Sequence, residues 1–223
     1  MRLLLVAEPD RSASTLIRVL AGLARPGRGR IEIAGLSDPT KDGWGRRVAH
    51  LGPEPGIHDW MTPREALELA AGLLDVAPIE AERRIERAIA WVRIPVSALD
   101  RPVGTGGPPL LQLTGFAAAL IGDPEVLLLD EPLRAIEADE RVRLLRLPGR
   151  RRTILLASRY PASEAGLVTH VALLRGGRVV MLARVADVEA AGQPLSLRGI
   201  IAFADQRAAT ARPGGQRTAA GLR

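Results

Sequence analysis

Short apolar runs alternate along this chain with segments in which apolar residues recur every three or four positions. The runs predict β-strands that are buried on both faces, and the longer period predicts amphipathic helices. Strands are expected at residues 2–7, 30–34, 47–51, 126–130, 153–158, 168–175 and 178–182. Helices are expected at residues 14–24, 63–75, 79–92, 110–121 and 138–147. This alternation predicts an α/β fold with a mostly parallel sheet flanked by helices.

Two stretches interrupt the alternation and define the expected domain organisation. Helical periodicity fills residues 63–121 apart from one loop, which predicts an inserted helical subdomain at about residues 58–121. Beyond residue 197 the sequence has low complexity and few large apolar side chains. We therefore expect one domain over residues 1–197 and a basic, disordered tail over residues 198–223.

Composition excludes several kinds of chemistry. The chain has no cysteine, which removes disulfides, thiolate metal sites and cysteine nucleophiles. Its three histidines lack the spacing of metal ligands and are interpreted as structural: His50, His58 and His170. No apolar run approaches the roughly 20 residues of a membrane span, and Glu8 follows the first apolar run too soon for a secretory leader. We expect a cytoplasmic protein.

The positive charge does not indicate a nucleic-acid partner. The formal net charge is +6, but residues 198–223 carry five arginines and one aspartate, so this segment alone contributes +4. The arginine cluster within residues 149–153 has no aromatic residues interleaved with it and is interpreted as a solvated turn. No nucleic acid is therefore expected to bind.

Four stretches in a distinctive order suggest a family. They are "STLIRVLAGLARPGRGRIEIAG", "DWMTPREALELAAGLL", "FAAALIGDPEVLLLDEP" and "HVALLRGGRVV". Over roughly residues 1–190 the chain resembles the nucleotide-binding subunit of an ATP-binding-cassette (ABC) transporter. The resemblance implies a P-loop NTPase-like sheet with an inserted helical subdomain, and ATP and Mg²⁺ as ligands.

The phosphate-binding loop departs most from the family pattern. The family motif is G-x-x-x-x-G-K-[ST], in which glycines let backbone N–H groups close on the phosphates and lysine neutralises them. Aligning the hydroxyl residues on Ser14 and Thr15 puts Ala13 at the lysine position. Ser12 and Ala7 then replace the two glycines. The loop therefore lacks the basic half of a phosphate site.

Some anion-binding features remain in this loop. The helix N-terminus offers free N–H groups, and Ser14 keeps the hydroxyl that would bind Mg²⁺. Arg11 is a candidate substitute for the lysine, although its planar guanidinium replaces a compact ammonium poorly. Glu8 and Asp10 lie within the aligned loop and are expected to face the phosphates and repel them.

The acidic half of the site matches the family better. The resemblance implies that Asp130 binds Mg²⁺ and that Glu131 is the general base, here expected to be vestigial. The position of the family's Q-loop glutamine falls on Pro53, or on Glu54 if the register slips by one. The switch histidine is replaced by Arg159, which cannot exchange a proton near neutral pH.

The family signature LSGGQ corresponds to residues 104–109, "GTGGPP". Gly106 and Gly107 keep some capacity to donate backbone hydrogen bonds, but Pro108 and Pro109 have no N–H. The resemblance therefore implies a degenerate signature.

These departures favour a degenerate ATP-binding subunit of an ABC transporter that is non-catalytic or binds nucleotide weakly. ATP and Mg²⁺ binding are expected to be weak or absent. The expected partners are a transmembrane subunit, docking near residues 53–61, and a second nucleotide-binding subunit, at the inner face of the cell membrane. Two alternatives stay open: a competent transporter ATPase with an atypical loop, and a soluble regulatory module that inherited the fold.

Overall fold

The computed structural model describes residues 1–8, 12–37, 39, 43–147 and 152–211. The expectations for Asp10, for Arg11 and for most of the 149–153 cluster therefore lie outside the described residues. Arg152 of that cluster is described, and its Nε donates to the carbonyl oxygen of Pro124 at 3.1 Å. At this residue the cluster anchors the chain locally.

A six-stranded sheet forms the centre of the molecule, in the order β2-β3-β4-β1-β5-β6. The strands are β1 (Arg2–Glu8), β2 (Val48–Leu51), β3 (Val126–Asp130), β4 (Thr153–Ala157), β5 (His170–Arg175) and β6 (Arg178–Arg184). The first five pair in parallel, and β6 pairs antiparallel to β5 across the Gly176–Gly177 turn. The predicted α/β class with a mostly parallel sheet is confirmed.

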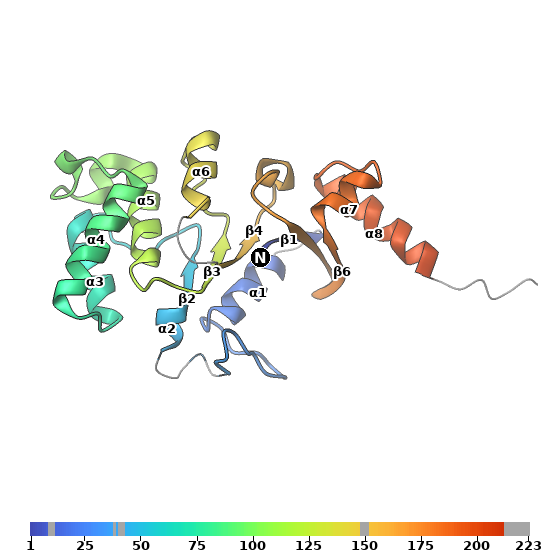
Figure 1. The fold of residues 1–223 in the computed structure, drawn as a ribbon, viewed down its shortest axis with the longest axis horizontal. Coiled ribbons are helices and arrows are strands. Elements are labelled where there is room, and N and C mark those ends of the chain that lie inside the picture. Colours follow the sequence, from blue (N-terminus) through green and yellow to red (C-terminus); the bar gives the residue numbers. More distant parts are fainter. Residues whose placement is uncertain (9–11, 38, 40–42, 148–151, 212–223) are drawn as a thin grey trace, which may run out of the picture.

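Helices cover the sheet and extend beyond both of its edges (Figure 1). They are α1 (Ser12–Leu20), α2 (Trp44–Arg47), α3 (Pro63–Leu73), α4 (Pro78–Val92), α5 (Gly107–Leu120), α6 (Ala138–Leu145), α7 (Val185–Ala190) and α8 (Leu197–Ala211). Figure 1 shows α3, α4 and α5 gathered at the β2 end of the sheet and α7 and α8 at the β6 end. Among the described residues, none of these helices has the length and apolar character needed to cross a membrane.

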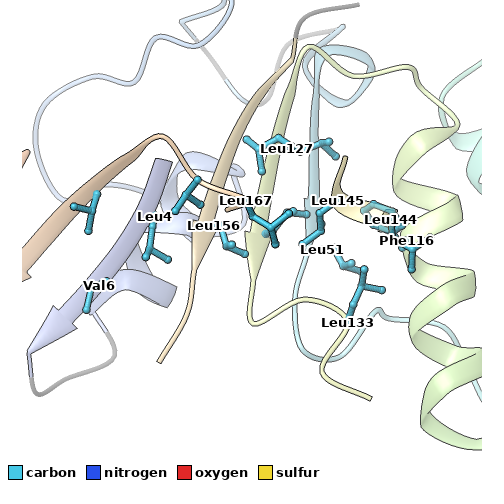
Figure 2. Packing of buried hydrophobic residues seen from close by; sticks show 14 of the residues in the cluster. Leu4, Val6, Leu51, Phe116, Leu127, Leu133, Leu144, Leu145, Leu156 and Leu167 are labelled. Carbon is cyan, nitrogen blue, oxygen red and sulfur yellow. The ribbon is translucent and has the colours of Figure 1, made fainter. Parts of the chain in front are cut away.

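Apolar side chains are buried on both faces of the sheet, as the short runs predict. On β3, Leu127 and Leu128 are both buried but belong to different clusters. The larger cluster joins the sheet to α3–α8, and Figure 2 shows members of it that include Leu4, Val6, Leu127, Leu156 and Phe116. The smaller cluster joins the opposite face to α1 through Ala13 and Ile17.

Local sequence fixes the start of α3. The hydroxyl of Thr62 accepts a hydrogen bond from the backbone N–H of Glu65, and the Glu65 carboxylate accepts from the Thr62 N–H at 2.9 Å. This capping box, with Pro63 at the first helical position, begins α3 at the first residue of the helix expected at 63–75. On α5, a Cβ at Gly115 would lie 2.4 Å from Cβ of Pro55, so glycine is required for this loop to approach α5.

The strand expected at residues 30–34 is wrong. The segment forms only an isolated bridge between Ile33 and Leu36. Ile31 and Ile33 instead pack, partly buried, against the smaller cluster. A strand needs a neighbouring strand to bind its N–H and C=O groups, and within the described residues none lies beside this segment.

The disordered tail expected from residue 198 is also wrong for its first part. Residues 197–211 form α8, in which Ile200, Phe203 and Ala204 are buried against the body of the protein. Their spacing follows one helix face, a signal that the low complexity of the segment obscures. Residues 212–223 lie outside the described residues.

Ile200→Ala should lower the free energy of unfolding by about 2–5 kcal/mol, because it deletes a fully buried side chain of α8. Leu197→Ala, in the same helix but 37% exposed, is the matched control and should cost much less. Urea denaturation of both variants gives the comparison. Equal and small losses would show that α8 does not pack on the body.

Candidate functional site

The expected acids lie at the carboxyl end of the parallel strands. In the sheet Asp130 of β3 stands beside Ala157 of β4, and the Glu131 N–H donates to the carbonyl oxygen of Ala157 at 3.0 Å. In Figure 1 the arrows of β2 and β3 point to the same edge. Open α/β sheets bind ligands at this edge, so the sequence places the acids where such a site forms.

The N-terminus of α1 meets this edge. The Ser14 hydroxyl donates to Oδ1 of Asp130 at 3.0 Å, in a partly buried hydrogen bond. Ser12 and Thr15 lie in the same first turn, and the methyl group of Ala13 is buried against the sheet. Of the predicted ligands, Ser14 and Asp130 are therefore brought together.

Asp130 is held in an electrostatically unfavourable position. Asp130 is only 6% exposed, and burial raises the pKa of its carboxyl above the ordinary value. The Ser14 hydrogen bond lowers that pKa, the charge of Glu131 raises it, and His50 and Arg159 lower it. The charged form of Asp130 therefore gains less from the protein than it would from water.

His50 lies near the same carboxylate, although the sequence indicates only a structural role for it. It stands beside Leu128 in the sheet, and its buried Nε2 has no hydrogen-bond partner among the described residues. Burial lowers the pKa of His50, the charge of Asp130 raises it, and Arg18 lowers it. A neutral imidazole is the form this environment favours.

Both oxygens of the Glu131 carboxylate are occupied by arginines. Oε1 accepts from the backbone N–H of Arg159 at 2.8 Å and from its Nε at 3.1 Å. Oε2 accepts from the Nη1 of Arg134, three residues further along the chain. Arg159, which the sequence aligns with the switch histidine, thus donates its hydrogen bonds to the Glu131 carboxylate.

Glu8 does not stand as an unpaired charge facing the phosphate loop. Arg175 at the end of β5 donates from Nε to Oε2 of Glu8 at 2.9 Å, and its Nη1 donates to Asp205 of α8 at 3.1 Å. The expected repulsion from Glu8 is therefore largely neutralised within the protein. Asp10, the other expected repulsive charge, lies outside the described residues.

The signature and Q-loop positions lie in the neighbouring part of the fold. Gly107 begins α5 with a φ of 63°, and Pro108 and Pro109 follow within its first turn. Prolines there remove N–H groups that a helix N-terminus otherwise offers to an anion. Pro53 is exposed in the loop after β2. Within the described residues, no hydrogen bond or ion pair joins Pro53 or Gly107 to the Asp130–Glu131 corner.

The described residues fit Mg²⁺ better than they fit phosphate. With Mg–O bonds of ~2.0–2.1 Å, neighbouring ligands of an octahedral ion are about 2.9 Å apart. The 3.0 Å between Ser14 Oγ and Asp130 Oδ1 matches that spacing. Phosphates need positive charge, yet residues 12–15 contain no cation, and Arg134, Arg159 and Arg175 are bound to carboxylates.

Comparison with known proteins gives the family. The family model described as ABC transporter matches residues 13–134. The taurine import ATP-binding protein TauB of Mesorhizobium japonicum is 34% identical over 186 residues, which are 80% of this chain and 67% of that protein. The aliphatic sulfonates import ATP-binding protein SsuB of Corynebacterium glutamicum is 32% identical over 180 residues, with 78% and 69% covered.

A third relative is longer. An uncharacterized ABC transporter ATP-binding protein of Nostoc is 31% identical over 173 residues, which are 75% of this chain and 51% of that protein. The chain thus spans about half to two thirds of the length of these relatives.

Solved structures agree on the fold. An ATP-binding subunit of an ABC transporter superposes with a TM-score of 0.75 at 22% identity, over 92% of this chain and 88% of that one. A dimeric ATP-binding cassette in a post-hydrolysis state with ADP and Pi gives 0.71 at 15% identity, over 83% and 85%. The fold, with Asp130 and Glu131 at the end of β3, is thus that of an ABC-type ATPase domain. The chain belongs to the ABC transporter family, as its ATP-binding domain.

Sequence reasoning assigns no role to two residues of the site, Arg134 and Tyr160. The guanidinium carbon of Arg134 lies 4.5 Å from the centroid of the Tyr160 ring. Arg134 follows Glu131 by three residues, and this spacing could have indicated the pair. Tyr160 is the only tyrosine of the chain and directly follows the switch position, but no sequence pattern links it to Arg134.

Asp130→Asn should raise the free energy of unfolding at about pH 7, because burial makes the charged form of Asp130 costly in the folded state. The folded-state pKa is raised, so the gain is full above that pKa. It should shrink as the pH falls through the raised folded-state pKa and be lost below the ordinary value of 3.8, where the carboxyl is protonated in both states.

Urea denaturation at about pH 7 and at about pH 3.5 tests this dependence. Asp59→Asn, at an exposed position, is the control and should change stability little. A loss of stability at neutral pH in Asp130→Asn would contradict the interpretation.

Proposed function

We propose that this chain is a degenerate ATP-binding subunit of an ABC transporter, non-catalytic or weakly nucleotide-binding, that supports transport by a partner assembly. One observation carries the proposal: three described arginines at the carboxyl ends of β3, β4 and β5 bind the chain's own carboxylates. Arg134 and Arg159 bind Glu131, and Arg175 binds Glu8. Ala13, a buried methyl group, occupies the position of the phosphate-binding lysine.

The pairing of the Glu131 carboxylate with two arginines also argues against ATP hydrolysis by this chain. A general base must reach the water whose proton it takes. Both oxygens of Glu131 already accept hydrogen bonds from cationic side chains, and its side chain is only 12% exposed. Removing it from these arginines would cost two charge-assisted hydrogen bonds before any proton transfer.

A transmembrane subunit is the first proposed partner, docking near residues 53–61. Trp60 in that segment is 70% exposed and stacks on His58 with ring centroids 5.6 Å apart. The segment is anchored to the signature region, because the Gly104 N–H donates to the carbonyl oxygen of Asp59 at 2.9 Å. A contact at Trp60 would therefore be transmitted to the start of α5.

A second nucleotide-binding subunit is the other proposed partner, and the assembly would lie at the cytoplasmic, inner face of the cell membrane. The solved dimeric cassette supports pairing of such domains. The relatives named for taurine and sulfonate import make small organic anions the first substrates to test. ATP and Mg²⁺ would act mainly on the partner domain.

Two alternatives remain. A competent ATPase with an atypical loop is favoured by the Ser14–Asp130 pair, whose spacing suits Mg²⁺. A soluble regulatory module on this fold would need no transmembrane partner. Co-purification with a multi-span membrane protein would separate either transporter function from the module.

The isolated chain should show no detectable binding of MgATP at sub-millimolar concentration in titration calorimetry, because the described arginines at the carboxyl ends of β3, β4 and β5 are paired with carboxylates. Ala13→Lys alone should not restore binding and should destabilise the fold by about 1–3 kcal/mol, since the added chain enters a packed face. A dissociation constant in the low micromolar range for the unmodified chain would contradict the proposal.

Glu131→Gln should leave the ATPase and transport rates of the whole assembly unchanged, once the amounts of folded complex are matched. The same change at the general base of a competent partner should abolish both rates, because only the proton-accepting group is lost. A several-fold loss from Glu131→Gln in this chain would favour the competent ATPase instead.

A further inference from the structure

The segment after β3 and the segment after β4 are joined by a bridge of polar contacts. We name it the Glu131 bridge, and its members are Glu131, Arg134, Arg159 and Tyr160. Arg134 binds Oε2 of Glu131 and lies over the Tyr160 ring, while Arg159 binds Oε1. A single carboxylate thus joins residues 131–134 to residues 158–160.

The geometry of Arg134 makes it the central member. Its side chain is 34% exposed, whereas that of Arg159 is 77% exposed. A guanidinium over an aromatic face gains from the ring quadrupole, and an ion pair is stronger where water is partly excluded. Arg134 contacts the Tyr160 ring and the Glu131 carboxylate at once. The ring therefore holds the guanidinium in place, and the guanidinium holds the carboxylate.

The backbone beneath the bridge is strained. Glu131 has a φ of 49° and Leu133 a φ of 55°, both in the left-handed region that is strained for non-glycine residues. Such conformations persist where surrounding contacts over-determine them. Arg141 also holds this backbone, because its Nε donates to the Pro132 carbonyl oxygen at 3.2 Å and its Nη2 binds buried Glu164.

We propose that Arg134 is a positioning residue that locks the segment after β4 to the segment after β3 without any nucleotide. Its guanidinium holds the Glu131 carboxylate, and the ring of Tyr160 holds the guanidinium. This inference rests on the proposed function and deepens it. The segment after β4 contains Arg159 at the switch position, and a subunit whose own side chains fix that segment does not respond to ATP.

The sole tyrosine gives a direct measurement of the bridge. Incorporating 3-fluorotyrosine produces one ¹⁹F resonance, from residue 160 of the full chain. Arg134→Gln and Glu131→Gln should each shift this resonance. In the Arg134→Gln background, the effect of Glu131→Gln should fall at least about twofold, since the two residues act through one contact. Arg207→Gln, which removes a similar cation–ring contact at Phe203, is the control and should not shift it.

Thermal denaturation of the same variants gives an independent readout. Arg134→Gln and Glu131→Gln should each lower the melting temperature by about 2–4 °C, and the double variant by less than the sum. Millimolar MgATP should leave the ¹⁹F resonance of the unmodified chain in place. Additive shifts in the double variant, or movement of the resonance with MgATP, would overturn the inference. If calorimetry detects tight ATP binding while the coupling persists, only the proposed function fails.

Discussion

The parallel pairing of β3 between β2 and β4 is the constraint on which the site depends. It aligns the carboxyl ends of the strands and puts Asp130 opposite Ala157, so the residues that follow β3 and β4 emerge side by side. Glu131 then meets Arg159 because the sheet register brings them together. Burial of Leu127 and Leu128 on opposite faces holds that register, since a slip of one residue would exchange the two clusters.

Three described arginines around the site are already paired with carboxylates of the chain. In a phosphate-binding site, cations are held ready for an anion that comes from solution. Here Glu131 and Glu8 already supply that anion for Arg134, Arg159 and Arg175. A phosphate group would have to displace a carboxylate that is covalently part of the chain, at a high effective concentration. This competition, more than any missing side chain, accounts for the low affinity we infer.

Much of the fold could be predicted from the sequence, because buried strands and capped helices have short-range signals. "VLLLDEP" places Asp130 and Glu131 at a strand end, and "TPRE" begins α3. The failures concern partners distant in sequence. Residues 30–34 have a strand pattern but no neighbouring strand, and α8 is ordered by packing that its composition does not reveal. The Arg175–Glu8 pair joins residues 167 positions apart, so no local pattern could indicate it.

The sheet pairing of the first strand is delayed while the protein is being synthesised. Within the described residues β1 pairs with β4 and β5, so the sheet partners of Leu4 there, residues 156 and 171, leave the ribosome long after it. At ~5–20 residues per second, elongation over that distance takes about 10–30 s. During this time an apolar strand with two unpaired edges is exposed in a chain that cannot yet close its sheet. The position that makes β1 the centre of the finished sheet therefore leaves it as a segment that a chaperone would protect while the protein is being made.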